Sequence, residues 1–272
     1  MSEQPAGRLV VCPTPIGNLE DVTLRALRAL READVIACED TRQTGKLLAR
    51  HGVEARLVSY HEHNERRRAR ELADRIARGE VVALVSDAGT PAVSDPGHVI
   101  LRECVEAGLE VEVLPGPSAV LTALVASALP AERWCFTGFL PRRKGELRRA
   151  LEAGGGTLVA FESPRRLPAT LALLSEIDPK RPVAVCRELT KLHEEIVRGS
   201  AAEVAERFTA GARGEIVLVV GPPEARAADE AQLGPARQAV ERLVEAGAKR
   251  RAAAAIVGGL TGLPANRLYR AN

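Results

Sequence analysis

Short apolar runs alternate with amphipathic helical segments through the first 220 residues of the chain. The runs are only five or six residues long and largely apolar on both faces, so each needs cover on both sides. Helices packed on the two faces of a parallel sheet provide that cover. In the first half we predict strands at residues 8–12, 34–38, 56–60, 81–86 and 110–114, and helices at 21–33, 44–51, 65–78 and 98–107.

The alternation restarts after a small-residue helix predicted at residues 119–128. The second set has strands at 134–139, 157–162, 182–187 and 215–220, and helices at 145–153, 167–177 and 201–208. The pattern therefore predicts the α/β class. We place an N-terminal α/β domain at residues 1–126 and a second α/β domain at 127–223.

Residues 224–272 differ in composition and form a predicted linker and basic helical tail. Helices are expected around 235–246, 250–258 and 264–270. Residues 225–272 hold eight Lys or Arg against four Asp or Glu, whereas the whole chain has a net charge of only +2. Helix, turn and helix in a basic segment resemble a helix-turn-helix appendage. A plain helical hairpin that caps the fold is the equally simple alternative.

The composition excludes several other classes of protein. No apolar run reaches the roughly 18 residues of a membrane span, and the N-terminus lacks a secretory layout, which favours the cytoplasm. The five cysteines are scattered among apolar neighbours, so we expect buried, reduced thiols. Aromatic residues are only 3% of the chain, which disfavours a single-strand binder built on stacking platforms.

Three glycine- and proline-containing loops follow predicted strands. PTPIGN begins at Pro13, SDAGTPAVSDPG spans residues 86–97, and PGPSA begins at Pro115. Ligands of open α/β sheets bind at the carboxyl ends of the strands, where these loops lie. The second loop has two glycines for close backbone approach and an unusual density of carboxylates and hydroxyls, so it is the strongest candidate site. The dinucleotide fingerprint GxGxxG is absent.

Acidic and imidazole side chains follow the second and third predicted strands. CEDTR places Glu39, Asp40 and Arg42 there, and YHEHNE places His61 and His63. Together they could form an acid/base and anion-binding wall. Helix N-terminal capping is the alternative role for the two acids. A metal held by Asp40 and the two histidines is a weaker alternative, because no established metal-ligand spacing accompanies them.

Cations collect after three strands of the second half, in FLPRRK, ESPRR and RELTK. Guanidinium and ammonium groups at one edge of a sheet suit phosphate oxygens, which favours a phosphate-rich substrate. Each group taken alone is equally well a solvated face. The residues concerned are Arg142, Arg143, Lys144, Arg165 and Lys191.

These motifs, in this order, make the sequence resemble the tetrapyrrole methylase superfamily of S-adenosylmethionine (SAM) enzymes. Within it the chain is similar to the ribosomal RNA small subunit methyltransferase I group. The resembling segments run from about Leu9 to Gly221, with a weaker match to the group's C-terminal helix-turn-helix. CEDTR and YHEHNE distinguish this group from the porphyrin and corrin methylases. Two departures are Ser86-Asp87, where the superfamily pattern begins with two glycines, and PGPSA, where many members have PGACA or PGASA.

The resemblance implies two α/β domains with SAM in the cleft between them, usually a homodimer, and no metal. Carried over by position, loops of the first domain would hold most of the cofactor, and strands of the second would close over it. The implied cofactor-binding residues are Pro15, Ile16, Gly17, Ser86, Asp87, Ala88, Gly89, Thr90, Asp95, Pro115, Gly116, Ser118, Ala119, Phe161, Glu162 and Glu215.

The resemblance also implies the reaction: methylation of the ribose 2′-oxygen of a cytidine in the decoding region of 16S rRNA. Asp40, Glu39 and His61 are the candidate bases for the 2′-hydroxyl proton. Arg42 would join the five cations after the strands in holding phosphates of the small ribosomal subunit. We expect no membrane partner and, because a 2′-hydroxyl is required, no DNA substrate. A tetrapyrrole methyltransferase using the same cleft, and a non-catalytic RNA-binding protein, are the competing interpretations.

Overall fold

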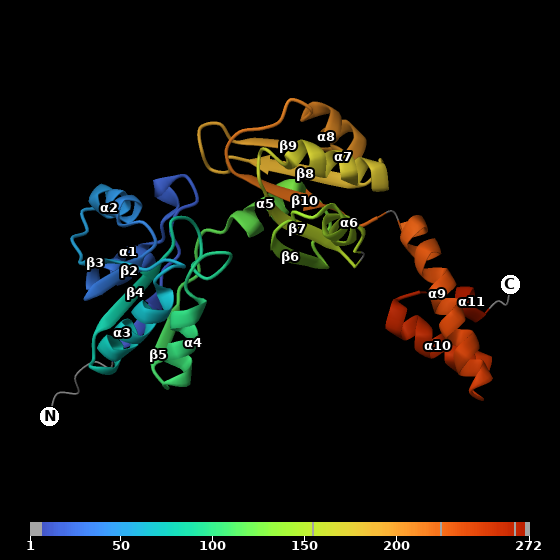
Figure 1. Cartoon of the computed structure of the whole chain (residues 1–272), viewed down its shortest axis with the longest axis horizontal. Coiled ribbons are helices and arrows are strands. Elements are labelled where there is room, and N and C mark those ends of the chain that lie inside the picture. The colour runs from blue at the N-terminus through green and yellow to red at the C-terminus, as the bar shows by residue number, and fades with distance from the viewer. Residues whose placement is uncertain (1–6, 154, 224, 264, 270–272) are drawn as a thin grey trace.

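The computed structural model describes residues 7–153, 155–223, 225–263 and 265–269, and these form two α/β units followed by helices (Figure 1). The first unit is a five-stranded, wholly parallel sheet in the order β3-β2-β4-β1-β5. Its elements are β1 (Arg8–Val11), η1 (Leu19–Asp21), α1 (Leu24–Glu32), β2 (Val35–Cys38), α2 (Thr41–Arg50), β3 (Leu57–Ser59), α3 (Glu65–Ala77), β4 (Val81–Val85), α4 (His98–Glu106) and β5 (Glu110–Val113).

Alternate residues of the central strands enter two different cores, one on each face of this sheet. On β4, Val82 and Leu84 pack in the core that contains Leu72 of α3, while Ala83 and Val85 pack in the core that contains Leu30 of α1. Burial on both faces explains why these strands read as unbroken apolar runs. The parallel, helix-covered sheet predicted from the sequence is therefore confirmed.

The second unit is a five-stranded mixed sheet in the order β6-β7-β10-β8-β9. Only β6 and β7 are parallel, and β10 runs antiparallel to both of its neighbours. Its elements are α5 (Ala119–Ser127), β6 (Trp134–Phe139), α6 (Lys144–Glu152), β7 (Thr157–Glu162), α7 (Leu167–Ile177), β8 (Pro182–Arg187), β9 (Glu195–Ser200), α8 (Ala201–Arg207) and β10 (Ile216–Val220).

The two faces of the second sheet are covered unequally, and this difference creates room for a ligand. One face packs against α6, α7 and α8 through a large core that includes Leu151, Leu171 and Val204. The other face is covered only in part, by α5 and by Ile16 from the first unit, and the part left open lines a cavity. Since α5 packs on the second sheet, its packing favours a domain boundary before Ala119. The boundary after residue 126 stays a prediction.

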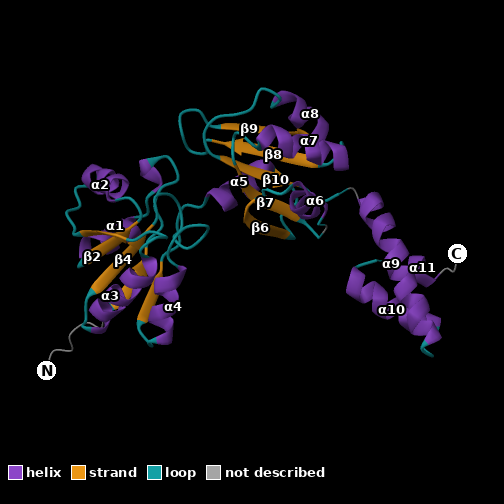
Figure 2. Ribbon diagram, in the orientation of Figure 1, coloured by secondary structure: helices purple, strands orange, loops and turns teal. Residues whose placement is uncertain are grey.

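In the described part of the tail, the helices α9 (Ala225–Glu245), α10 (Arg250–Thr261) and α11 (Ala265–Tyr269) lie together at the C-terminal end (Figure 2). They share a small hydrophobic core of their own. Val240 of α9, Val257 of α10 and Leu268 of α11 are buried in it. The helix expected to begin around Pro235 begins earlier, at Ala225, and continues through that proline, so much of the predicted linker is helical. In the part of the chain that the structure describes, no helix combines the length and apolar character needed to cross a bilayer.

Candidate active site between the two sheets

All five strands of the parallel sheet end at one edge, so the loops that follow them lie together. The loops after β1 and β4 are joined by a two-bond bridge, in which the amides and carbonyls of Thr14 and Gly89 pair at 2.9 and 3.0 Å. The Thr14 hydroxyl donates to the Ser86 carbonyl at 3.0 Å, and the Thr90 hydroxyl donates to the Pro117 carbonyl at 3.3 Å. These bonds hold three loops as one wall.

The loop after β4 turns sharply through residues with positive φ. Gly89 (φ 78°) and Gly97 (φ 145°) use the freedom of glycine, but Ala92 (φ 67°) and Ser94 (φ 66°) adopt the left-handed region at an energetic cost. Such strain persists only where the surroundings enforce it, and it concentrates at functional sites. Here the turn places Ser94 and Asp95 on the wall of a cavity.

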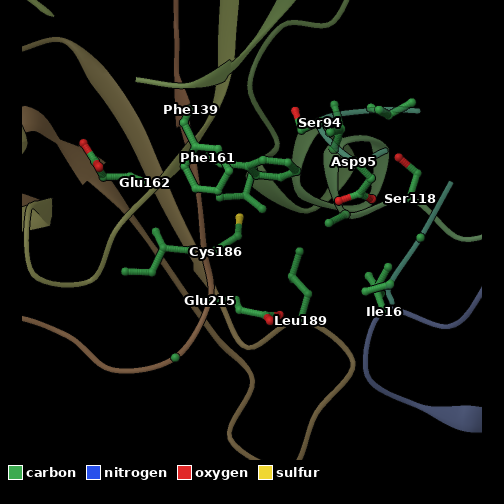
Figure 3. A pocket seen from close by; sticks show the side chains of 18 of the residues that line it. Ile16, Ser94, Asp95, Ser118, Phe139, Phe161, Glu162, Cys186, Leu189 and Glu215 are labelled. Atoms are coloured by element: carbon green, nitrogen blue, oxygen red, sulfur yellow. The ribbon is translucent and has the colours of Figure 1, made fainter. Parts of the chain in front are cut away.

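That cavity has a volume of about 430 Å³ and lies between the loops of the first unit and the open face of the second sheet. In Figure 3, Ser94, Asp95 and Ser118 stand on one side, while Phe139 and Phe161 stand on another. Its lining is mainly apolar with a few polar groups, which is the usual character of a small-molecule site.

Ten of the sixteen residues predicted to bind cofactor line this cavity. They are Ile16, Ala88, Gly89, Thr90, Asp95, Ser118, Ala119, Phe161, Glu162 and Glu215. The other six lie in the same loops but away from the lining: Pro15, Gly17, Ser86, Asp87, Pro115 and Gly116.

Three of the sixteen predicted residues, and the neighbouring Asn18, also make contacts that stabilise the fold and that the sequence did not indicate. The Glu162 side chain is fully buried; its carboxylate accepts from the Thr170 hydroxyl at 2.6 Å and from the Ser163 amide at 2.7 Å. The Ser118 hydroxyl caps α5. Gly17 lies so close to the loop after β8 that an added Cβ would sit 2.5 Å from Lys191 Cγ. Asn18 donates its amide to the Thr190 hydroxyl at 3.0 Å, joining the two units directly.

Other lining residues were missed by the sequence analysis. Phe139, Cys186, Leu189 and Val217 belong to the second unit and point to its open face. To predict them, one must know the strand order of the second sheet and which part of its face α5 leaves uncovered. Short sequence motifs contain neither kind of information. Cys135 was also expected to be buried, yet it is exposed, because β6 is an edge strand.

The carboxylates of Glu39, Asp87 and Asp95 interact electrostatically beside the cavity. Burial raises the pKa of Asp95 to about 6, helped by the negative charges of Glu39 and Asp87. Burial and Asp87 also raise the pKa of Glu39, while His61 opposes the rise. Asp95 lines the cavity itself, whereas Glu39 does not.

Asp40 has a different environment from its neighbour Glu39. Its carboxylate is the N-cap of α2 and accepts three hydrogen bonds from Arg42, one from the amide and two from the guanidinium. These bonds lower the pKa of Asp40 to about 2. The capping alternative is therefore confirmed for Asp40, and a carboxylate this acidic is a weak base.

The histidines after β3 pack against each other, and His61 also contacts Asn64, the N-cap of α3. His61 and His63 have ring centroids 5.9 Å apart, and His61 Nε2 lies 3.2 Å from the Asn64 amide nitrogen. Among the described residues no group of three His, Cys, Asp or Glu side chains is arranged to hold a metal ion.

The predicted phosphate contacts fall into two groups. Arg42 is engaged by Asp40, and Lys191 is engaged by Glu188 and Glu215 at 3.0 and 2.9 Å. The other four are exposed after β6 and β7, and the closest carboxylate contact among them is the 3.5 Å approach of Arg143 to Glu146. These four are Arg142, Arg143, Lys144 and Arg165.

Comparison with known proteins agrees with this architecture. The family model for Tetrapyrrole (Corrin/Porphyrin) Methylases matches residues 8–205. Uroporphyrin-III-C-methyltransferase from Thermus thermophilus superimposes with a TM-score of 0.57 and 23% identity, covering 79% of this chain and 94% of that one. A diphthine synthase superimposes with a TM-score of 0.60 at 17% identity, over 79% of this chain and 90% of that one. Fold and family model thus define a methyltransferase of the tetrapyrrole methylase class, which uses SAM.

Sequence relatives narrow this class. Ribosomal RNA small subunit methyltransferase I of Micromonospora olivasterospora is 44% identical over 98% of this chain and 87% of its own length. The protein of the same name from Mycobacterium tuberculosis is 45% identical over 98% and 94%, respectively. That from Thermotoga maritima is 43% identical over 80% of this chain and all of its own length. The chain belongs to the ribosomal RNA small subunit methyltransferase I family.

Proposed function

We propose that the chain transfers a methyl group from SAM to the ribose 2′-oxygen of a cytidine in the decoding region of 16S rRNA. The observation that carries the proposal is a cofactor-sized cavity in a chain 43–49% identical to proteins named for rRNA methylation. The exposed cations Arg142, Arg143 and Lys144 follow closely on Phe139, which lines that cavity. The proposed setting is the cytoplasm, where the small ribosomal subunit is the partner.

The cavity suits SAM in volume and in chemistry. Ile16, Leu189 and Val217 offer apolar surface for an adenine ring, and Asp95 offers a carboxylate for a cationic group or a ribose hydroxyl. When bound, SAM supplies a methyl group activated by its sulfonium. The residues of both units then orient that group and the hydroxyl, because positioning contributes much of the rate of an in-line displacement.

Titration of Asp95 provides a test of this site through pH. With the pKa of Asp95 near 6, the carboxylate is protonated below pH 6 and loses its attraction for a cation. We therefore expect SAM affinity, measured by calorimetry, to rise as pH increases from 5 to 7 and then to level off. The Asp95→Asn variant should show a flat profile over that range. A wild-type profile as flat as that of the variant would contradict the assignment.

The proposed proton acceptor is Glu39. Among Glu39, Asp40 and His61, Glu39 alone combines a carboxylate with a raised pKa and the electrostatic neighbourhood of Asp95. Asp40 is held as a weak base by Arg42. A hydroxyl nucleophile gains most from a base whose pKa is nearer to the working pH.

The adjacent acids Glu39 and Asp40 offer a matched pair of variants. Glu39→Gln should lower kcat about 100-fold, in the range of general-base removal, with SAM affinity little changed. Asp40→Asn should keep kcat within about threefold, because its cap can still be made by an amide oxygen. Equal losses of kcat in the two variants, or a loss of kcat only in Asp40→Asn, would contradict the assignment of Glu39 as the base.

The basic tail is the proposed docking element for the folded subunit. Its helices pack on a core of their own, so removal of residues 224–272 leaves the cavity lining intact. We expect this truncation to raise the KM for small subunits at least about tenfold and to leave SAM affinity unchanged. Parallel losses of both affinities would indicate a structural tail instead.

A homodimer is the proposed assembly. Helix α5 carries no charged residue, and while one side packs on the second sheet, Leu121 and Val125 are 51% and 80% exposed. A helix that is apolar all round is usually buried, which supports cover by a second copy. Sedimentation analysis of the wild type and of a Leu121→Lys, Val125→Lys variant tests this directly: a dimer and a monomer, respectively, are expected.

The alternative function, methylation of a tetrapyrrole, can be tested with the same protein. SAM consumption is measured with small subunits and, separately, with a reduced uroporphyrin macrocycle whose absorbance reports methylation. We expect SAM to be consumed with small subunits as the substrate and not with the macrocycle. Turnover with the macrocycle alone would establish the alternative.

A further inference from the structure

Four of the seven aromatic residues in the chain gather on two neighbouring strands beside the cavity. Trp134, Phe136 and Phe139 lie on β6, and Phe161 lies on β7. In a chain with so few aromatic rings, this concentration at one place calls for a physical reason. Packing accounts for Phe136 and Phe161, which join the core on the open face of the second sheet.

An irregularity in β6 places Phe139 on the same face as Phe136. Residues three apart on a regular strand point to opposite faces. Here the pairing of β6 with β7 shifts register between Phe136 and Phe139, and Gly138 has a φ of 67°. As a result both rings contact Phe161, with centroid separations of 5.0 Å for Phe136 and 5.4 Å for Phe139. A bulge of this kind redirects a side chain next to a site.

Phe139 differs from its two partners because its ring remains open. It is 64% exposed and lines the cavity, on a side different from that of Asp95 (Figure 3). The bulge itself faces the first unit, since a Cβ on Gly138 would lie 3.4 Å from Ser94 Oγ. A large apolar ring left open at a cavity mouth is available to a ligand that enters from outside.

The residues that follow Phe139 determine which class of ligand suits it. The exposed cations Arg142, Arg143 and Lys144 begin three residues later. Arg166 fixes this segment by donating to the carbonyls of Leu140 and Pro141 at 3.0 and 2.6 Å. An aromatic face beside a cationic track is the arrangement that binds a single-stranded nucleic acid, by stacking a base and holding its phosphates.

We propose that Phe139 stacks on the nucleobase of the nucleotide that is methylated, and so fixes its ribose at the cavity mouth. The proposal rests on the proposed function and names a positioning residue for it. A nucleotide that leaves the stack of its neighbours can carry its 2′-oxygen to the cavity, and an aromatic face then replaces the stacking that it gives up.

The experiment compares four substitutions by methyl transfer to small subunits and by calorimetric binding of SAM. Phe139→Ala should lower kcat/KM for subunits about tenfold or more, the range found when base stacking is removed, with SAM affinity within about twofold of wild type. Phe139→Tyr should recover most of the loss, and Phe139→Leu should not. Val105→Ala, which truncates an apolar side chain 67% exposed on α4, is the control and should leave both quantities unchanged.

Three results would overturn the proposal. They are full activity of Phe139→Ala, equal recovery by leucine and tyrosine, and a loss of SAM affinity in Phe139→Ala that matches its loss of activity. The last result would place the ring on the cofactor instead. Failure of the wild type to methylate subunits at all would refute the proposed function itself, and is thereby distinguished from failure of the Phe139 assignment.

Discussion

Replacing Arg142, Arg143 and Lys144 together by glutamine is expected to lower kcat/KM for methyl transfer to small ribosomal subunits by at least about 100-fold. The three side chains are exposed directly after β6, the strand whose last residue, Phe139, lines the cavity. Charge-assisted hydrogen bonds to phosphate are each worth roughly 1.5–3 kcal/mol, so removal of two or three gives an effect of this size. SAM affinity should stay within about twofold, because none of the three lines the cavity.

Salt dependence separates this specific binding from a general effect of charge. The slope of log affinity against log salt should become shallower by about two to three, one for each phosphate that the variant no longer neutralises. A control with Arg28, Arg78 and Arg102 changed to glutamine removes the same charge from α1, from the C-cap of α3 and from α4. Equal losses in the control and the test variant would contradict a specific role for the loop after β6.

Gly89→Val is expected to abolish measurable SAM binding, with at least a 100-fold loss of affinity, and therefore all methyl transfer. Gly89 lines the cavity with a φ of 78°, and both its amide and its carbonyl pair with Thr14. A Cβ there would lie 3.4 Å from Ile16 Cγ2 and 3.7 Å from the Pro117 carbonyl oxygen. A branched side chain would strain the backbone and occupy the space between these loops.

Gly108 supplies the matched control for this substitution. It has a φ of 68°, yet an added Cβ would meet nothing within 4 Å. Gly108→Val therefore imposes similar backbone strain away from the cavity, and it should lower thermal stability by a comparable amount while SAM still binds. If Gly108→Val lost SAM affinity as completely as Gly89→Val, the effect would come from destabilisation and not from the cavity.

The first unit could be predicted from sequence because its strands are buried on both faces. Residues 81–85 have no polar position, and only a strand covered by helices on both sides explains such a run. Parallel strands end at one edge, so the loops after β1, β4 and β5 could be placed together before the structure was known. The observed bridge between Thr14 and Gly89 agrees with that reasoning.

The second unit was predicted less completely, because the sequence of an edge strand does not carry the apolar pattern of a buried strand. Strand β9 (Glu195–Ser200) went unpredicted, because its residues are half-exposed at the end of the sheet and lack an apolar run. The sheet is mixed because β9 pairs antiparallel with β8, and because β10 lies between β7 and β8 and runs antiparallel to both. Helix α9 continues through Pro235, where local sequence favoured a start.

In the candidate site, the loop residues could be predicted from local sequence, whereas the residues that the strand order brings to the cavity could not. The loop that holds Thr90 and Asp95 was singled out by its composition, and the family resemblance assigned these two residues to the cofactor. Phe139 and Leu189, in contrast, reach the cavity only through the strand order. The basicities of Glu39 and Asp40 could not be separated in sequence, since the two are adjacent. Their difference comes from Arg42, which binds one carboxylate and not the other.

The central claim is tested most directly by incubating the protein with methyl-labelled SAM and small ribosomal subunits from a strain that lacks it. The rRNA is then digested to nucleosides and separated beside 2′-O-methylcytidine and base-methylated cytidine. Label in 2′-O-methylcytidine is the predicted result. Label in a base-methylated nucleoside, or no label in RNA while SAM binds normally, would contradict the proposed reaction.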